Sequence, residues 1–184
     1  MKRTAISWLV AGLALALPSA ASAELAAGAK APAFTARGAL GGKAFTVSLA
    51  SALKKGPVVL YFYPKAFTSG CTLEAHAFAE ASGDFAKAGA TVIGMSNDDL
   101  PTLQRFSTEA CRDKFAVAAA TPAIVKAYDV DLVRDGKSTG YTKRTSYVIG
   151  QDGRIKLVHS DMDYKDHVRM TLDAVKAMKG RRKA

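Results

Sequence analysis

The sequence predicts an α/β domain whose centre is a mixed β-sheet, and three observations support this fold class. Two continuous apolar runs, Val58–Tyr63 and Ala90–Ser96, are typical of central strands that are covered on both faces. A segment with the apolar period of a helix follows each run. Later in the chain, Thr145–Ile149 and Arg154–Val158 flank the turn sequence Gln151-Asp-Gly153, which indicates a hairpin.

The chain before the first apolar run predicts a lead-in loop and a small hairpin. Ala26–Gly42 is rich in Ala and Gly, which is typical of a loop. Phe34–Ala36 and Lys43–Val47 are expected to pair across Gly38–Gly42. Lys54–Pro57 then supplies the turn that leads into the first central strand.

The first helix is predicted over Thr72–Ala88, directly after the first central strand. Gly83 is a weak point inside this helix, and Gly89 ends it. The apolar residues of the segment recur at helical spacing and are Leu73, Ala77, Phe78, Ala81 and Phe85.

The remaining elements continue the alternation of strands and helices. Asp98 or Asp99 is expected to cap a helix that has Pro101 in its first turn. The other predicted elements are a short strand at Phe115–Val117, a short helix at Pro122–Tyr128 and a final helix at Tyr164–Met178 that turns Val168, Leu172 and Val175 toward the sheet. This order matches a thioredoxin-like fold with a mixed central sheet and an N-terminal β-hairpin extension.

The beginning of the chain has the pattern of a secretory signal peptide. A short basic start precedes the apolar run Ile6–Leu17, and Ala21-Ser-Ala23 is an A-x-A cleavage site. We therefore expect a signal peptide at 1–23, a single domain at 24–184, and a periplasmic or secreted product. An uncleaved membrane anchor is the alternative, but the run is shorter than the about 20 apolar residues of a comfortable span.

Net charge and cysteine content narrow the function classes. The formal charge is +10, but the basic residues are scattered except for the terminal cluster Lys179–Lys183, which is typical of a solvated tail rather than a nucleic-acid site. The two cysteines, Cys71 and Cys111, would in an exported protein usually form a disulfide. A permanent bridge between them would stabilise the fold by roughly 4 kcal/mol, whereas a catalytic bridge would form and break during turnover.

The most informative motif joins the first central strand to the first helix. Pro64, Thr68 and Cys71 follow the strand at the spacing P-x-x-x-T-x-x-C, which places one thiol at a helix start. Backbone N–H groups and the positive end of a helix stabilise a thiolate, the nucleophilic form of cysteine. Thr68 could cap the helix and also bond a substrate oxygen, and Pro64 would fix the chain and limit solvent access to the thiol. The alternative is a buried, inert Cys71 with Thr68 as a simple cap.

This motif closely resembles the active-site motif of the peroxiredoxins. The segment Tyr61–Glu74 is nearly the signature of the bacterioferritin comigratory protein group, or Q-type peroxiredoxins, and the similarity extends over Ala31–Met178. The resemblance implies a thiol peroxidase that reduces hydrogen peroxide and organic hydroperoxides through a Cys71 sulfenic acid. It implies no cofactor and no metal.

The resemblance also implies an arginine partner for the thiol. The segment Tyr141–Gly153 resembles the family segment that carries this arginine, which makes Arg144 the candidate that polarises the peroxide and holds the thiolate. Lys143 competes for the role, and a surface arginine is the alternative. Glu74, one helical turn after Cys71, is expected to orient Arg144, although it could instead only complement the helix start.

Cys111 is the expected resolving cysteine. Many members of the family group carry a second cysteine five residues after the first, where this chain has His76. Cys111 lies near the end of the later predicted helix, and its condensation with the sulfenic acid would give an intramolecular disulfide. A disulfide needs Cα atoms within about 7 Å, so the first turn of the Cys71 helix is expected to unwind. The alternative is that an external thiol resolves Cys71.

Partners and rival functions follow from the same residues. Location outside the cytoplasm implies an exported thioredoxin-like protein or a small thiol as the reductant, and we expect a monomer. A metal-binding thioredoxin-fold protein is a rival, but His76, His159 and His167 have no ligand spacing. A disulfide oxidoreductase would need C-x-x-C, and Glu74 occupies the second cysteine's position. A non-enzymatic thiol sensor could share Cys71.

Overall fold

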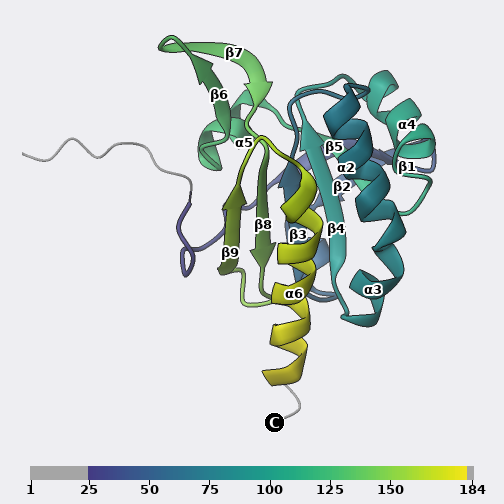
Figure 1. Cartoon of the computed structure of the whole chain (residues 1–184), viewed down its shortest axis with the longest axis vertical. Helices are drawn as coiled ribbons and strands as arrows, with labels where there is room; N and C mark the ends of the chain where they lie inside the picture. The colour runs from purple at the N-terminus through teal and green to yellow at the C-terminus, as the bar shows by residue number, and fades with distance from the viewer. Residues whose placement is uncertain (1–24, 182–184) are drawn as a thin grey trace, which may run out of the picture.

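A seven-stranded mixed sheet forms the centre of the protein (Figure 1), whose computed structural model describes residues 25–181. The predicted signal peptide and its cleavage site lie outside the described residues. The strands are β1 (Thr35–Leu40), β2 (Lys43–Ser48), β3 (Val58–Phe62), β4 (Thr91–Ser96), β5 (Ala116–Ala119), β8 (Thr145–Ile149) and β9 (Ile155–Ser160). Their order in the sheet is β2-β1-β5-β4-β3-β8-β9. β3, β4 and β5 are parallel, and the other neighbouring pairs are antiparallel.

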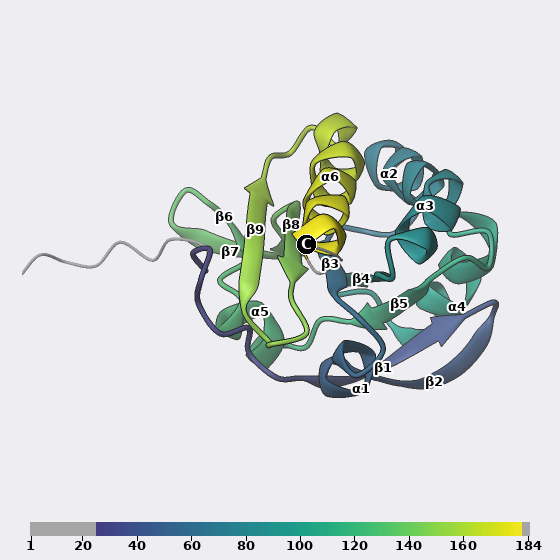
Figure 2. The ribbon, with the colours of Figure 1, turned by 90° about the horizontal axis from the view of Figure 1, so that it is seen from below.

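Helices cover both faces of the sheet, so β3 is buried throughout. The helices are α1 (Leu49–Leu53), α2 (Ser69–Glu80), α3 (Ser82–Lys87), α4 (Leu100–Glu109), α5 (Pro122–Ala127) and α6 (Lys165–Arg181). Figure 2 shows α2, α3 and α6 on one side of the sheet and α1 on the other. No helix within residues 25–181 is long and apolar enough to cross a membrane.

The core has two halves because successive residues of β3 point to opposite faces of the sheet. Val58, Leu60 and Phe62 belong to the half that packs beneath α1 and α5. Val59 and Tyr61 belong to the half that also contains both cysteines and the buried faces of α2, α4 and α6. The end of β3 therefore delivers the following loop to the cysteine side of the sheet.

The structure confirms the predicted mixed sheet, both apolar central strands and both hairpins. β1 pairs with β2 in a six-residue antiparallel register, and β8 pairs with β9 beyond the Gln151-Asp-Gly153 turn. Asp99, rather than Asp98, caps α4 through a 2.9 Å hydrogen bond from the N–H of Thr102. Val175 in α6 is fully buried against the cysteine half of the core, as predicted.

The predicted helix over Thr72–Ala88 is wrong as a single element. It begins earlier, at Ser69, and divides into α2 and α3 at Ala81, two residues before the weak point Gly83. The predicted strand at Phe115–Val117 is displaced to Ala116–Ala119.

Three further elements, one helix and the two strands of a hairpin, lack a counterpart among the predicted ones. α1 is capped by Ser48, whose hydroxyl accepts a hydrogen bond from the N–H of Ser51. β6 (Asp131–Arg134) and β7 (Lys137–Thr142) form a separate hairpin that extends from the body of the protein (Figure 1). Its Asp135-Gly136 turn has positive φ angles at both residues, the geometry that favours Asp-Gly in two-residue hairpin loops.

Candidate active site

The loop between β3 and α2 is fixed at its centre by an aspartate from the neighbouring strand end. The backbone N–H of Ala66 donates to the Asp98 carboxylate at 2.7 Å. The Ser96 hydroxyl donates to the same carboxylate oxygen at 2.7 Å. Asp98 thus positions the loop rather than capping α4. The sequence predicts Asp98 only as a possible cap of α4. The feature that could have indicated its role in the loop is a second acid directly after a buried strand.

Phe67 stores backbone strain in this loop. Its φ of 64° lies in the left-handed region, which is unfavourable for an aromatic residue and costs on the order of 1–3 kcal/mol. The ring packs edge-on against Phe106 at 5.2 Å between centroids, and the Arg105 guanidinium lies 5.0 Å from its centroid. These contacts from α4 hold the strained turn that precedes Thr68 and Cys71.

Thr68 occupies the N-cap position of α2, but its side chain does not cap the helix. The hydroxyl instead donates a 3.0 Å hydrogen bond to the carbonyl of Lys65, within the loop. The predicted cap hydrogen bond is therefore wrong, because the hydroxyl turns back toward the loop. Cys71 lies in the first turn of α2, so the predicted thiol at a helix start is confirmed, and it is only 1% exposed.

Arg144 reaches the thiol from the segment between β7 and β8. Its Nη2 lies 3.6 Å from the Cys71 Sγ, its Nη1 donates to the Glu74 carboxylate, and its Nε donates to the Met162 carbonyl at 3.0 Å. A Cβ on Gly70 would approach Nη2 to 3.3 Å, so glycine there leaves room for the guanidinium. Arg144 is 5% exposed, which excludes the surface alternative.

Lys143 does not share this position. Lys143 borders a pocket beside β6 and β7, together with Asp131 and Gly140, and none of the predicted site residues borders that pocket. Of the two neighbouring basic residues, Arg144 therefore contacts the thiol.

The Glu74–Arg144 pair is buried, and each partner alters the other's ionisation. Burial raises the pKa of the fully buried Glu74 carboxyl to about 8, because the Arg144 guanidinium opposes this rise only in part. Burial lowers the pKa of Arg144, but the charges of Glu74 and Cys71 outweigh burial and leave that pKa above its ordinary value. The Glu74 carboxyl is therefore harder to ionise than a free one, even beside the Arg144 guanidinium.

A buried polar cluster from β8 and α6 lies behind this pair. The His167 Nδ1 is 2.8 Å from the Ser146 hydroxyl and 3.8 Å from the second Glu74 oxygen, which has no hydrogen-bond partner. The His167 Nε2 lies 2.9 Å from the Asp161 carbonyl. Burial lowers the pKa of His167 to about 4, so the ring is neutral near pH 7 and donates from Nε2 to that carbonyl. Sequence reasoning had considered His167 only as a metal ligand.

Cys111 lies in the turn directly after α4 and is fully buried. Both cysteines are free thiols and belong to the same half of the core. Burial raises the pKa of the Cys111 thiol, and the Asp113 carboxylate raises it further. Burial also raises the pKa of Tyr61, and negative charge on either cysteine adds to that rise, so both thiols lie near this phenol.

The predicted residues Pro64, Thr68, Cys71, Glu74 and Arg144 gather around the start of α2. Pro64 begins the loop, and the last three form a continuous contact chain from thiol to guanidinium to carboxylate. Within residues 25–181, no group of three or more His, Cys, Asp or Glu side chains could hold a metal ion. The arrangement can hold a thiolate beside a fixed cation, where it could attack an electrophile.

Fold and site together define a class: a thioredoxin-like protein with one buried cysteine facing an arginine at a helix start. Residues 27–158 match the AhpC/TSA family, and the chain belongs to that family of peroxiredoxins, which are thiol peroxidases. It is 32% identical to the peroxiredoxin Bcp of Bacillus subtilis over 66% of this chain and 78% of that protein. It is also 32% identical to the chloroplastic peroxiredoxin Q of Suaeda salsa over 85% of this chain and 70% of that protein.

Solved structures agree with this assignment. The structure of peroxidoxin BcpB from Mycobacterium tuberculosis superposes with a TM-score of 0.73 and 28% identity, covering 83% of this chain and 97% of that one. Peroxiredoxin Q from Xanthomonas campestris gives a TM-score of 0.68 and 27% identity, covering 78% of this chain and 90% of that one. The predicted thioredoxin-like fold and the Bcp or Q-type resemblance are therefore confirmed.

Proposed function

We propose that this peroxiredoxin reduces hydrogen peroxide and organic hydroperoxides with Cys71 as the attacking thiolate. The observation that carries the proposal is the 3.6 Å contact between the Arg144 guanidinium and the Cys71 sulfur in a site almost closed to solvent. The guanidinium N–H groups can bond the sulfur and also a peroxide oxygen. Thr68 and Pro64 stand at the loop that would border the substrate.

The first step transfers one oxygen atom to sulfur. The Cys71 thiolate attacks one peroxide oxygen, an S–O bond forms and the O–O bond breaks. The second oxygen leaves as water or an alcohol after it takes a proton, and Cys71 becomes a sulfenic acid. Sulfur is oxidised by two electrons and the peroxide is reduced by two. Arg144 would stabilise the charge that passes from sulfur to the leaving oxygen.

Cys111 is proposed to complete an atypical two-cysteine cycle. Its thiol sulfur would attack the Cys71 sulfenic sulfur, form an intramolecular disulfide and release water. Burial of both cysteines supports a rearrangement before this step, including unwinding of the first turn of α2. The raised pKa of Cys111 also favours exposure before attack, since the thiolate is the reactive form.

The reductant is proposed to be a thioredoxin-like protein or a small thiol. The two thiols of a thioredoxin-like protein, or two molecules of a small thiol, would return the Cys71–Cys111 disulfide to two thiols and leave as a disulfide. The proposed signal peptide at 1–23 would place both reactions in the periplasm or outside the cell. We further propose that the domain works as a monomer, because the proposed cycle uses cysteines of one chain only.

Steady-state peroxide consumption with excess dithiol tests the proposal, with mass mapping of both cysteines. Wild type should turn over many equivalents of peroxide, and Cys71→Ser should turn over none. Cys111→Ser is the matched control: it should retain one rapid oxidation of Cys71 but lose the intramolecular disulfide. A wild-type protein that consumed one equivalent and then stalled would instead indicate a thiol sensor.

A further inference from the structure

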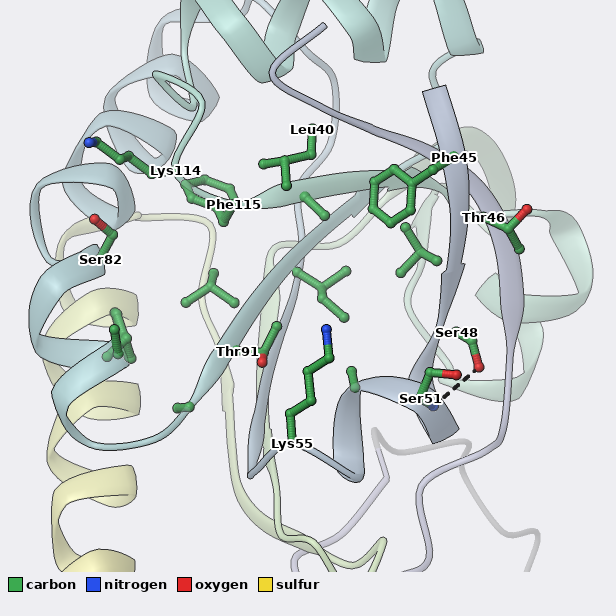
Figure 3. Close-up of a pocket in the computed structure, with 18 residues that line it drawn as sticks. Leu40, Phe45, Thr46, Ser48, Ser51, Lys55, Ser82, Thr91, Lys114 and Phe115 are labelled. Atoms are coloured by element: carbon green, nitrogen blue, oxygen red, sulfur yellow. Dashed lines mark hydrogen bonds between the residues drawn. The ribbon is translucent and has the colours of Figure 1, made fainter. Parts of the chain in front are cut away.

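A second cavity, away from Cys71, lies between the N-terminal hairpin and the start of β4 (Figure 3). It has a volume of about 460 Å³. β5 first pairs with β4 at Ala116 opposite Ile93, so β5 contributes no partner to Thr91 or Val92. β1 in turn pairs with β5 at only two positions. The short β5 therefore leaves a hollow between β2 with α1 on one side and β4 with α3 on the other.

The walls of this cavity are mostly apolar and include three aromatic rings. Phe45 comes from β2, Phe85 from α3, and Phe115 directly precedes β5. Phe45 and Leu40 are 41% and 40% exposed, although large apolar side chains of a soluble domain are usually covered. The volume lies within the range of about 300–1,000 Å³ of small-molecule sites, which are also mainly apolar.

The charged groups of the cavity are all positive. Lys55 and Lys114 line it, and no Asp or Glu does. Figure 3 shows the Lys55 side chain extending among the lining residues, with Ser51 and Thr91 nearby, and Lys114 at the edge. Within residues 25–181, neither lysine ammonium forms a hydrogen bond or an ion pair with the protein. An anionic head group could therefore pair with Lys55 without displacing a protein partner.

We propose that this cavity binds one medium-chain carboxylate, with the carboxylate at Lys55 and the acyl chain against Phe45, Phe85 and Phe115. The apolar walls match an alkyl chain, and the unpaired ammonium groups match one negative head. None of the residues proposed for peroxide reduction lines the cavity, so the site is distinct from the thiol site. The inference does not depend on the proposed catalytic cycle.

Isothermal titration of the folded domain with decanoate tests the proposal. Binding should occur at one site per chain and should strengthen about fourfold per methylene from octanoate to dodecanoate, the increment of one buried CH₂. Decanol, which has the chain without the charge, should bind more weakly. Lys55→Gln should weaken decanoate binding about threefold to fivefold, as expected for one partly exposed ion pair. The matched control Lys54→Gln removes the neighbouring charge outside the cavity and should change nothing.

A blocking variant gives a second, independent result. Ala86 lines the cavity from an exposed position on α3, so Ala86→Phe should fill the cavity without disturbing the core and should abolish binding. Its circular dichroism spectrum and peroxide turnover should match those of wild type. Equal decanoate affinity in wild type, Lys55→Gln and Ala86→Phe would overturn the proposal.

Two other occupants give distinguishable outcomes, and either would overturn it. If a second copy of the chain fills the cavity, sedimentation velocity would reveal a dimer of the wild-type protein, and Phe45→Ser would dissociate it. If the occupant is a lipid surface, the wild-type protein should pellet with phosphatidylglycerol vesicles and should not bind free decanoate. Lys55→Gln should then abolish the pelleting. The proposal expects a monomer that does not pellet with vesicles and binds free decanoate.

Discussion

Replacement of Arg144 by methionine removes the cation at Cys71 while keeping a side chain of similar length. Arg144 Nη2 lies 3.6 Å from the sulfur, and two unit charges at that distance interact by roughly 5 kcal/mol at an effective dielectric constant of about 20. Desolvation of the guanidinium offsets much of this energy. A net hydrogen bond to a charged group contributes about 1.5–3 kcal/mol. The second-order rate of Cys71 oxidation should therefore fall about 10- to 150-fold in Arg144→Met.

Stopped-flow mixing of the reduced protein with peroxide measures this rate, with quenched samples read by mass spectrometry. Lys143→Met is the matched control because it removes the adjacent positive charge outside the site, and its rate should stay within about twofold of wild type. An Arg144→Met rate equal to that of wild type would refute the assignment of Arg144 to the thiol.

The same substitution should change the pH dependence of stability. The pKa of the Glu74 carboxyl already lies above the unfolded value of about 4.3, and removal of Arg144 leaves burial unopposed and raises it further. A raised folded pKa means that stability is present below the unfolded pKa and is lost as pH rises toward the folded pKa. Urea midpoints of Arg144→Met should therefore fall more steeply than those of wild type as pH rises above about 4.3. Arg144→Met with Glu74→Gln should remove that slope but should not restore the oxidation rate.

Three further variants test other parts of the account. Cys111→Ser should leave Cys71 oxidation within about twofold of wild type but abolish the intramolecular disulfide. A non-reducing peptide map of peroxide-treated wild type without a Cys71–Cys111 bridge would contradict this. His167 has a folded pKa near 4 against 6.5 unfolded, so wild type should lose up to about 3 kcal/mol of unfolding free energy as pH falls from 6.5 to 4. His167→Gln should not show this pH-dependent loss. Identical urea midpoints against pH in both proteins would argue against a buried neutral ring. A Cβ at Gly94 would lie 2.8 Å from the buried Tyr61 ring, so Gly94→Ala should lower the unfolding free energy by about 1–3 kcal/mol. An unchanged melting temperature would contradict this and would show that the Tyr61 ring can move.

The parts of the fold that the sequence predicted are those set by local patterns. β3 is apolar at every position because both of its faces are covered, and the structure buries all five of its residues. The D-G turn before β9 and the Asp99 cap of α4 are likewise short-range features. The division between α2 and α3 was missed because apolar residues keep a helical period across Ala81.

The thiol site was predictable only in part, because only some of its contacts join residues that are close in the sequence. The strand, loop and helix around Cys71 are contiguous, so its place at a helix start followed from the sequence alone. Arg144 lies 73 positions further along the chain, and only its resemblance to a family segment identified it. The contact of Asp98 with Ala66 and that of His167 with Ser146 depend on how distant strands and helices meet, which no local pattern records.

The central claim is that Cys71 is the residue that reduces peroxide, and mass mapping after one equivalent of peroxide tests it most directly. The reduced wild-type protein should consume the equivalent and gain oxidation only at Cys71, first as a sulfenic acid and then as a bridge to Cys111. Cys71→Ser should leave the peroxide unconsumed. Full peroxide consumption by Cys71→Ser, with oxidation at Cys111 or at a methionine, would contradict the account.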